Sequence, residues 1–328
     1  MAARAAPRPD TTRHGWRSDR PLLLACAALA AVVTALAASG EARLAWWTPA
    51  PPSVALVAAD LRGHALLVFD PSKPDTARRI PLPGGPHELL RLPDGRVVVS
   101  LEQRGALAVV DLDGGIVQTV EVGGIPHGLA VEHGVLTVTD RSADVLRRFA
   151  LGTWAELPPQ PVARWPHAVQ AFPGGGLAVA SADADLLTVN GRGIAVSELP
   201  ETVTIALDGR IATAGAAGGV VEVFDADGQR RARHEVGGRP VRVAFSPDGR
   251  TLVAALSAAG TAAIVTEGAV RYVAVGGVPD GLAFSPDGRW LYVADTAYGH
   301  VSTVEVARAR LVSRVPVGDS AGALLALP

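Results

Sequence analysis

The chain has few of the residue types on which many protein chemistries depend. It contains one cysteine, Cys26, in an apolar stretch near the N-terminus, and only 5% of its 328 residues are aromatic. The sequence after Cys26 therefore cannot form an internal disulfide, a thiolate metal site or a cysteine nucleophile. The net charge of −2 gives no electrostatic basis for binding nucleic acid, and no nucleic-acid partner is predicted.

Several catalytic sequence motifs are also missing. The chain has no G-x-S-x-G nucleophile elbow, no P-loop and no dinucleotide-binding fingerprint between a strand and a helix. Its glycine pairs, such as Gly123-Gly124 and Gly276-Gly277, are followed by a proline and an apolar run, which is typical of a turn. The sequence therefore does not support a serine hydrolase or a nucleotide-dependent enzyme.

The N-terminal region predicts export. Residues 1–20 carry five arginines and two aspartates and are predicted to be a basic, disordered tail. Residues 21–39 have no charge and are long enough to span a bilayer as a signal-anchor helix, or they form a cleavable signal peptide. The basic flank places the N-terminus in the cytoplasm, so the rest faces outward. After a linker at 40–52, the chain is predicted to be membrane-anchored outside the cytoplasm, or secreted or periplasmic if cleaved.

A repeated unit fills the remainder, residues 53–328. Its clearest copy begins GGVPDGLAFSPDGRWLYVADTAYGHVSTVEV, at Gly276. Apolar runs at 281–284, 290–294, 301–306 and 311–317 predict four short strands, with a Pro-Asp-Gly turn between the first two. Four antiparallel strands in about 40 residues are typical of one propeller blade. The turn proline recurs with this period at Pro86, Pro126, Pro166, Pro200, Pro240 and Pro279.

The unit resembles the YVTN-type β-propeller repeat, as found in exported or membrane-anchored bacterial-type propellers. The resemblance implies an all-β, seven-bladed propeller and covers nearly all of the chain after residue 53. Six units are complete. A C-terminal strand at 323–327 and N-terminal strands at 54–59, 63–70 and 77–83 are predicted to form the seventh blade together, which closes the ring.

The residues that follow the turn prolines are the candidate functional residues. In an up-and-down blade, the turn before the first strand and the loop between the second and third strands share one face. That placement brings His87, His127 and His167 to the channel mouth with Glu201 and Asp280. Imidazoles and carboxylates bind divalent transition metals such as Zn²⁺, Mn²⁺ and Cu²⁺, so a metal site is predicted there. The alternative is that these histidines only hydrogen-bond the backbone of neighbouring blades.

Three loop aspartates complete the predicted mouth. Asp60, Asp140 and Asp295 each follow a predicted second strand, and they are expected at the channel-mouth rim. Asp side chains often cap their own loops by accepting backbone hydrogen bonds, and this is the alternative to a ligand role.

The leading functional hypothesis is an extracytoplasmic binding or scaffolding module that uses the channel-mouth face. Its partners would be the membrane, through residues 21–39, and an extracytoplasmic protein or a small molecule. The resemblance implies one alternative, a metal-dependent hydrolase or lyase similar to lactonases. The histidine cluster itself suggests another, a copper-binding redox accessory. Similar lactonases hold their ion with acidic and amide side chains, whereas this chain offers mostly histidines.

Overall fold

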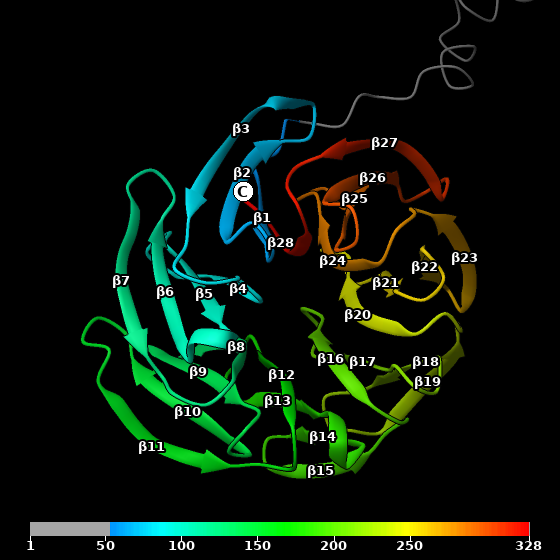
Figure 1. Cartoon of the computed structure of the whole chain (residues 1–328). Coiled ribbons are helices and arrows are strands. Elements are labelled where there is room, and N and C mark those ends of the chain that lie inside the picture. The colour runs from blue at the N-terminus through cyan, green and yellow to red at the C-terminus, as the bar shows by residue number, and fades with distance from the viewer. Residues whose placement is uncertain (1–52, 328) are drawn as a thin grey trace, which may run out of the picture. The chain divides into compact units, whose positions relative to one another are not determined.

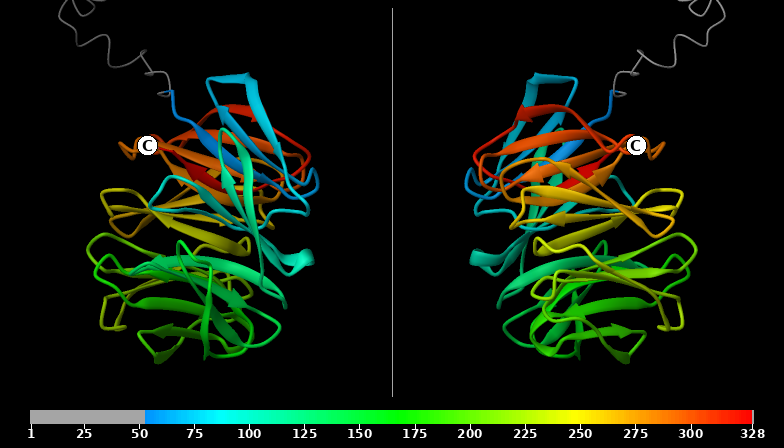
Figure 2. Two further views of the ribbon diagram at one scale, coloured as in Figure 1. Left: turned by 90° about the vertical axis from the view of Figure 1, so that its left-hand side faces the viewer. Right: turned by 90° about the vertical axis from the view of Figure 1, so that its right-hand side faces the viewer.

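Seven four-stranded antiparallel sheets surround a central channel in a computed structural model that describes residues 53–327 (Figure 1). The predicted tail, membrane helix and linker, at 1–20, 21–39 and 40–52, lie outside the described residues. Among residues 53–327, no helix is both long and apolar enough to cross a membrane. Figure 2 shows the ring edge-on, with loops at its two faces.

The innermost strand of each blade borders the channel, and six of the seven blades are continuous in sequence. In order from blade 1 to blade 7, the innermost strands are β28 (Ala321–Ala326), β4 (Leu89–Arg91), β8 (Pro126–Glu132), β12 (Pro166–Ala171), β16 (Pro200–Ile205), β20 (Pro240–Phe245) and β24 (Pro279–Phe284). The second strands are β1 (Leu56–Asp60), β5 (Val97–Leu101), β9 (Val135–Asp140), β13 (Leu177–Ser181), β17 (Ile211–Gly215), β21 (Thr251–Leu256) and β25 (Trp290–Asp295).

The outer half of each blade follows the same order. The third strands are β2 (Ala65–Asp70), β6 (Ala106–Asp111), β10 (Val145–Ala150), β14 (Leu186–Val189), β18 (Val220–Phe224), β22 (Thr261–Thr266) and β26 (His300–Glu305). The fourth strands are β3 (Lys73–Pro81), β7 (Gly115–Glu121), β11 (Glu156–Pro161), β15 (Arg192–Ala195), β19 (Arg230–Glu235), β23 (Ala269–Ala274) and β27 (Arg310–Pro316). Two 3₁₀ turns, η1 (Glu102–Arg104) and η2 (Ala182–Ala184), join second strands to third strands.

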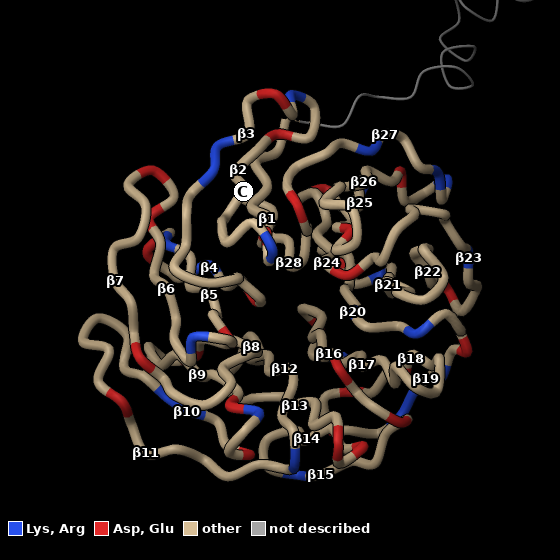
Figure 3. Tube along the Cα trace, in the orientation of Figure 1, with Lys and Arg blue, Asp and Glu red and all other residues tan. Residues whose placement is uncertain are grey.

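Burial explains the strand sequences. The second strands β5 and β25 are buried along their whole length, because they pack between neighbouring blades, and they are correspondingly apolar. The fourth strand β27 alternates exposed and partly buried residues, as a half-covered strand should. Acidic and basic positions are interspersed around the ring (Figure 3).

The predicted closure of the ring is confirmed. Strand β28 pairs antiparallel with β1, with Val57 opposite Leu325 and Ala58 opposite Leu324. Blade 1 therefore contains both ends of the described chain, in the order β28-β1-β2-β3. Large buried side chains of blade 7, Trp290 and Tyr292, belong to the same apolar cluster as the strands of blade 1. Closure thus joins the last blade to the first through a continuous core.

The innermost strands of blades 7 and 1 approach so closely at Gly281 that only glycine fits. A Cβ there would lie 2.1 Å from the carbonyl oxygen of Gly322 and 2.9 Å from the amide of Leu324. We expect Gly281→Ala to lower the free energy of unfolding by about 3 kcal/mol, because backbone atoms must move apart. Urea denaturation would measure it. Gly174→Ala is the matched control, since a Cβ there meets nothing within 4 Å; equal stability of the two variants would contradict this reading.

Candidate functional site

Three histidine rings lie in a row at one end of the channel. His87 precedes β4, His127 lies in β8 and His167 lies in β12. The ring centroids of His87 and His127 are 4.4 Å apart, and those of His127 and His167 are 3.9 Å apart. We call this end the histidine face. The turns before the innermost strands and the loops after the second strands meet there, as the bond from the Arg141 amide to the Ile125 carbonyl (3.1 Å) illustrates.

A β-bulge lies at two of the three histidines. The pairing register shifts between Pro126 and Leu129 in blade 3, and between Pro166 and Ala168 in blade 4. A bulge re-aims the extra residue and ends regular pairing. Strict alternation of the strand therefore does not decide where His127 and His167 point, and the bulges help to place both rings at the mouth.

His127 has the least ordinary environment of the three. Its side chain is 2% exposed, and neither ring nitrogen has a hydrogen-bond partner among the described residues. Its Nε2 lies 3.6 Å from the Glu102 carboxylate. Burial, together with the neighbouring His167 and His87, holds the pKa of His127 well below its ordinary value. The ring is therefore neutral at physiological pH and offers a nitrogen lone pair, as a metal ligand must.

His167 is oriented by the backbone of the next blade. Its Nδ1 lies 2.6 Å from the carbonyl oxygen of Glu201, to which it donates. Burial and the charge of Arg141 lower the pKa of His167 to about 3, although the bond to Glu201 acts in the opposite direction. With Nδ1 carrying the proton, Nε2 holds the lone pair. A backbone carbonyl orients many metal-binding histidines in this way.

The ligand atoms that converge belong to His87, Glu88 and His127. One donor atom from each lies within 4.8 Å of the others. Glu88 lies beside His87 on the channel wall and was not predicted from the sequence. Its signal was available, because the blade turns at Pro126 and Pro279 have glycine two residues after the proline, whereas here that position is a carboxylate. The ring of His167 packs against that of His127, but His167 does not belong to the converging group.

An arginine bridge spans the channel beside this group. Arg242, in β20, donates from Nη1 to Glu88 (2.9 Å) and from Nε and Nη2 to Asp280 (3.2 and 3.1 Å). Burial opposes ionisation of Asp280, but the Arg242 charge prevails and holds its pKa below the ordinary value. The predicted ligand Asp280 is thus engaged by a guanidinium, and it lies outside the converging group. Sequence reasoning did not identify Arg242.

Glu201 is also held by an arginine. Its carboxylate lies 3.0 Å from Nη2 of Arg239, and burial raises its pKa. Its carbonyl, not its side chain, contacts the histidine row. Glu201 therefore positions His167, and the structure does not place its side chain in the converging group.

The three loop aspartates cap backbone amides. Asp295 accepts from the amides of Val278 (2.8 Å) and Ala297 (2.9 Å), so it ties a second-to-third loop to the turn of its own blade. Asp60 does the same with Gly63 and Ser320, across the two ends of the chain. Asp140 accepts from Ile125 (3.1 Å) and from Arg147. All three are nearly fully buried, as capping requires.

A second acid–arginine pair lies next to His127. Glu102, in η1, accepts from Nη2 of Arg141 at 2.8 Å, and the Arg141 guanidinium stands 5.1 Å from the Trp165 ring centroid. Burial raises the pKa of Glu102, although His87 and Arg141 oppose this. A carboxyl of raised pKa beside a neutral imidazole can accept or donate a proton. These residues were also missed, because they lie outside the turn positions.

Unpaired buried polar atoms concentrate at this mouth. Among the described residues, four buried side-chain atoms of this site lack a hydrogen-bond partner: Nδ1 of His87, both ring nitrogens of His127 and Nε of Arg141. Most buried polar groups in folded proteins are paired, so such a concentration calls for a functional explanation. Directly below lies a channel cavity of about 280 Å³, lined by Glu88, His127 and Arg242 among others.

The neutral histidines predict an acid-sensitive protein. The pKa of histidine in an unfolded chain is about 6.5, whereas that of the partly buried His167 is about 3, so unfolding takes up a proton between these values. The contribution of the neutral histidine to the free energy of unfolding is therefore fully present above about pH 6.5. It decreases as pH falls, by about 1 kcal/mol per pH unit for each such histidine. Denaturation at pH 7 and pH 5 would measure the slope. We expect His167→Gln to make this slope shallower; an unchanged slope would contradict a neutral His167 in the folded state.

The fold recurs in proteins of known structure. No protein-family model and no curated protein matches the chain. Among solved structures, the periplasmic gluconolactonase of Pseudomonas aeruginosa is 18% identical (TM-score 0.69; 84% of this chain, 99% of that one). A putative 6-phosphogluconolactonase from Bacteroides fragilis is 17% identical (TM-score 0.68; 86% of this chain, 100% of that one). A virginiamycin B lyase from Staphylococcus aureus is 14% identical (TM-score 0.62; 71% of this chain, 84% of that one). At these identities the chain shares its β-propeller fold, and the fold alone, with proteins that include gluconolactonases and lyases.

Proposed function

We propose that this propeller binds a small-molecule ligand at the histidine face of its channel, through a divalent transition-metal ion held by His87, Glu88 and His127. The observation that carries the proposal is the buried, neutral ring of His127, whose nitrogens have no partner among the described residues. The proposal includes a location outside the cytoplasm, which rests on the sequence of residues 1–39.

The donor set fits a transition metal. Two imidazoles and one carboxylate are the ligands of many catalytic zinc sites, in which a further position stays open for water or a ligand. Neutral nitrogen donors favour Zn²⁺, Cu²⁺ or Fe²⁺ over Ca²⁺ or Mg²⁺, which prefer oxygen. Glu88 retains lone pairs for a metal while it accepts from Arg242, since each carboxylate oxygen has more than one acceptor direction.

The charge around the site also favours a cation. Glu88, Glu102 and Asp280 contribute three negative charges, and Arg141 and Arg242 contribute two positive ones. These five groups together carry one net negative charge. A divalent ion would leave one net positive charge, which suits an anionic group on the ligand.

A metal-dependent hydrolase or lyase is the second candidate, and one observation favours it. The Glu102 carboxyl, with a pKa raised by burial, lies 3.6 Å from His127 and so beside the proposed metal. A metal lowers the pKa of bound water, and a neighbouring base can then accept its proton. The Pseudomonas aeruginosa protein is a gluconolactonase, so lactones are the first substrates to assay. Lactone hydrolysis lost in Glu102→Gln with metal binding retained would establish catalysis. A copper-binding redox accessory would instead be marked by selective copper binding.

Metal titration of the purified full-length chain tests the binding proposal. We expect one Zn²⁺ or Cu²⁺ per chain by calorimetry. We expect His87→Ala or Glu88→Gln to weaken binding by roughly 100-fold or more, because even residues that only support a ligand contribute 10- to 100-fold. Circular dichroism would show that each variant is folded.

Two control variants make the titration specific. Asp280→Asn removes a carboxylate that shares Arg242 with Glu88 but lies outside the converging group, so it should change metal affinity less than tenfold. His133→Ala removes an exposed histidine from a hairpin turn and should change nothing. The proposal fails if the parent binds no metal, or if His133→Ala weakens binding as much as Glu88→Gln does.

A further inference from the structure

The channel changes from polar to apolar along its length. Near the histidine face, its cavity is lined by Glu88, His127 and Arg242. Further along the innermost strands, the same cavity is lined by aliphatic residues that include Leu90, Leu129 and Leu282, and by the uncharged polar residues Gln170, Thr202 and Thr204. A pocket that is charged at one end and aliphatic at the other is complementary to a molecule with a charged end and an apolar end.

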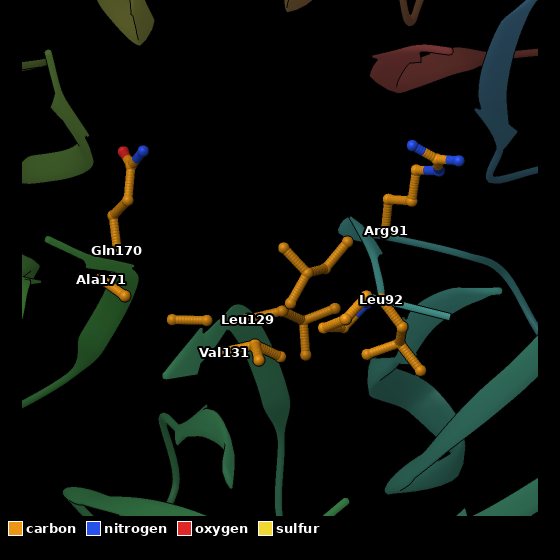
Figure 4. Close-up of a pocket in the computed structure, with 9 residues that line it drawn as sticks. Arg91, Leu92, Leu129, Val131, Gln170 and Ala171 are labelled. Carbon is orange, nitrogen blue, oxygen red and sulfur yellow. The ribbon is translucent and has the colours of Figure 1, made fainter. Parts of the chain in front are cut away.

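The apolar end opens to the opposite face of the ring. A second cavity, of about 490 Å³, shares Leu90, Leu129 and Gln170 with the channel cavity. In Figure 4 the side chains of Arg91 and Gln170 stand on opposite sides of this pocket, those of Leu129 and Val131 lie between them, and Leu92 lies beneath Arg91. A third cavity, of about 530 Å³, continues from Val131 and Gln170 to Phe172. The apolar lining is therefore continuous from the channel to this face.

The charge of the polar end selects the head group. Once a divalent ion is bound, the mouth carries one net positive charge, so an anionic oxygen donor would complete both the coordination and the charge balance. The channel cavity below it would bury an attached apolar group, and each methylene removed from water adds to the binding free energy.

We propose that the natural ligand is a small amphiphile, with an anionic metal-coordinating head at His87, Glu88 and His127 and an apolar chain or ring in the channel below. This proposal rests on the metal site proposed above. It assigns the substrate class, because a head group without an apolar part would leave the leucine-lined channel unused.

A homologous series of alkyl hydroxamates tests it on the zinc-loaded full-length chain. Calorimetry would give Kd for acetohydroxamate and for the butano, hexano and octano homologues. We expect each methylene to tighten binding about threefold to fourfold until the channel is filled.

Two variants test where the alkyl chain of the hydroxamate lies. Ala244→Phe places a large side chain in the channel cavity, so it should abolish the dependence on chain length and leave zinc and acetohydroxamate binding unchanged. Ala226→Phe, at an exposed outer turn, is the matched control and should preserve the dependence. If Ala244→Phe does not fold, Leu90→Gln replaces it, because it makes both connected cavities more polar.

The outcomes separate the two proposals. If zinc binds and Kd is the same for all homologues, the amphiphile proposal is overturned while the metal site stands. If no zinc binds, the metal site fails, and alkyl carboxylates are titrated into the metal-free chain with Arg242 as the head-group partner. A Kd that tightens with chain length, and loses that trend in Ala244→Phe, would then still support the apolar channel; a flat series would overturn it.

Discussion

Removal of residues 321–328 is expected to abolish cooperative folding of the propeller. These residues include all of β28, which is the innermost strand of blade 1 and the hydrogen-bonded partner of β1. Without it, β1 would expose an unpaired edge, and β24 of blade 7 would lose the strand against which Gly281 packs. The ring would be open at its one non-consecutive junction.

Thermal denaturation followed by circular dichroism would measure this effect. We expect the truncated chain to be insoluble or to melt without a cooperative transition. Deleting only residues 327–328 is the control, since it keeps β28 and removes the single backbone bond from Leu327 to Ala55. A truncated chain that melts cooperatively at the parent midpoint would contradict closure by β28.

Arg242→Met is expected to be the most damaging single substitution at the channel. It leaves the carboxylates of Glu88 and Asp280 close together without their shared cation, and both are largely shielded from solvent. Removing one partner of a buried ion pair costs about 3 kcal/mol or more at neutral pH, because the remaining charge stays desolvated. Arg242→Lys should recover only part of this, since lysine cannot donate to both carboxylates in the same forked geometry.

The pH dependence distinguishes this loss from ordinary packing damage. Arg242 lowers the folded-state pKa of Asp280, so the pair's contribution is present above the unfolded pKa of about 3.9 and is lost as pH falls through the folded value. In Arg242→Met, the guanidinium is absent, so burial would raise the pKa of Asp280 instead. The stability difference between parent and variant, measured by urea denaturation, should therefore be largest near pH 7 and shrink towards pH 4. A difference that does not change with pH would assign the loss to packing alone.

The repeat predicted most of the fold because every blade has the same strand order and packs against its neighbours in the same way. Strand positions, the Pro-Asp-Gly hairpins and closure by the chain ends all follow from local patterns that recur about every 40 residues. The strand bounds differ from the predicted ones by a few residues. Strand β4 begins only at Leu89, because the His87 amide bonds to the Ser100 carbonyl and the Glu88 amide to the Ser100 hydroxyl before regular pairing starts.

The site was predicted only in part, for a physical reason. The histidine row occupies one repeated position, so the repeat was sufficient to bring His87, His127 and His167 together. The partners of the row depend on distances across the channel. Arg242 and Glu88 are 154 residues apart in sequence and meet only because the ring closes. No local pattern encodes such a contact, and the same arginine also pairs with Asp280, a predicted ligand that lies outside the converging group.

Glu102 and Arg141 illustrate the same limit. Each lies in a loop between a second and a third strand, where the sequence analysis considered only the aspartates. Their pairing depends on the contact between blades 2 and 3. The aspartates themselves are used to cap loops, a role that their sequence position allowed but did not distinguish from a place at the rim.

Anomalous diffraction would show whether a metal ion binds at His87, Glu88 and His127. A crystal of the protein grown with Co²⁺ or Zn²⁺ would be measured above and below the absorption edge of the metal. The account predicts one strong anomalous peak at the channel mouth, about 2.0–2.2 Å from a nitrogen of each histidine and from a Glu88 oxygen. A peak elsewhere on the ring, or none at the mouth at saturating metal, would contradict it.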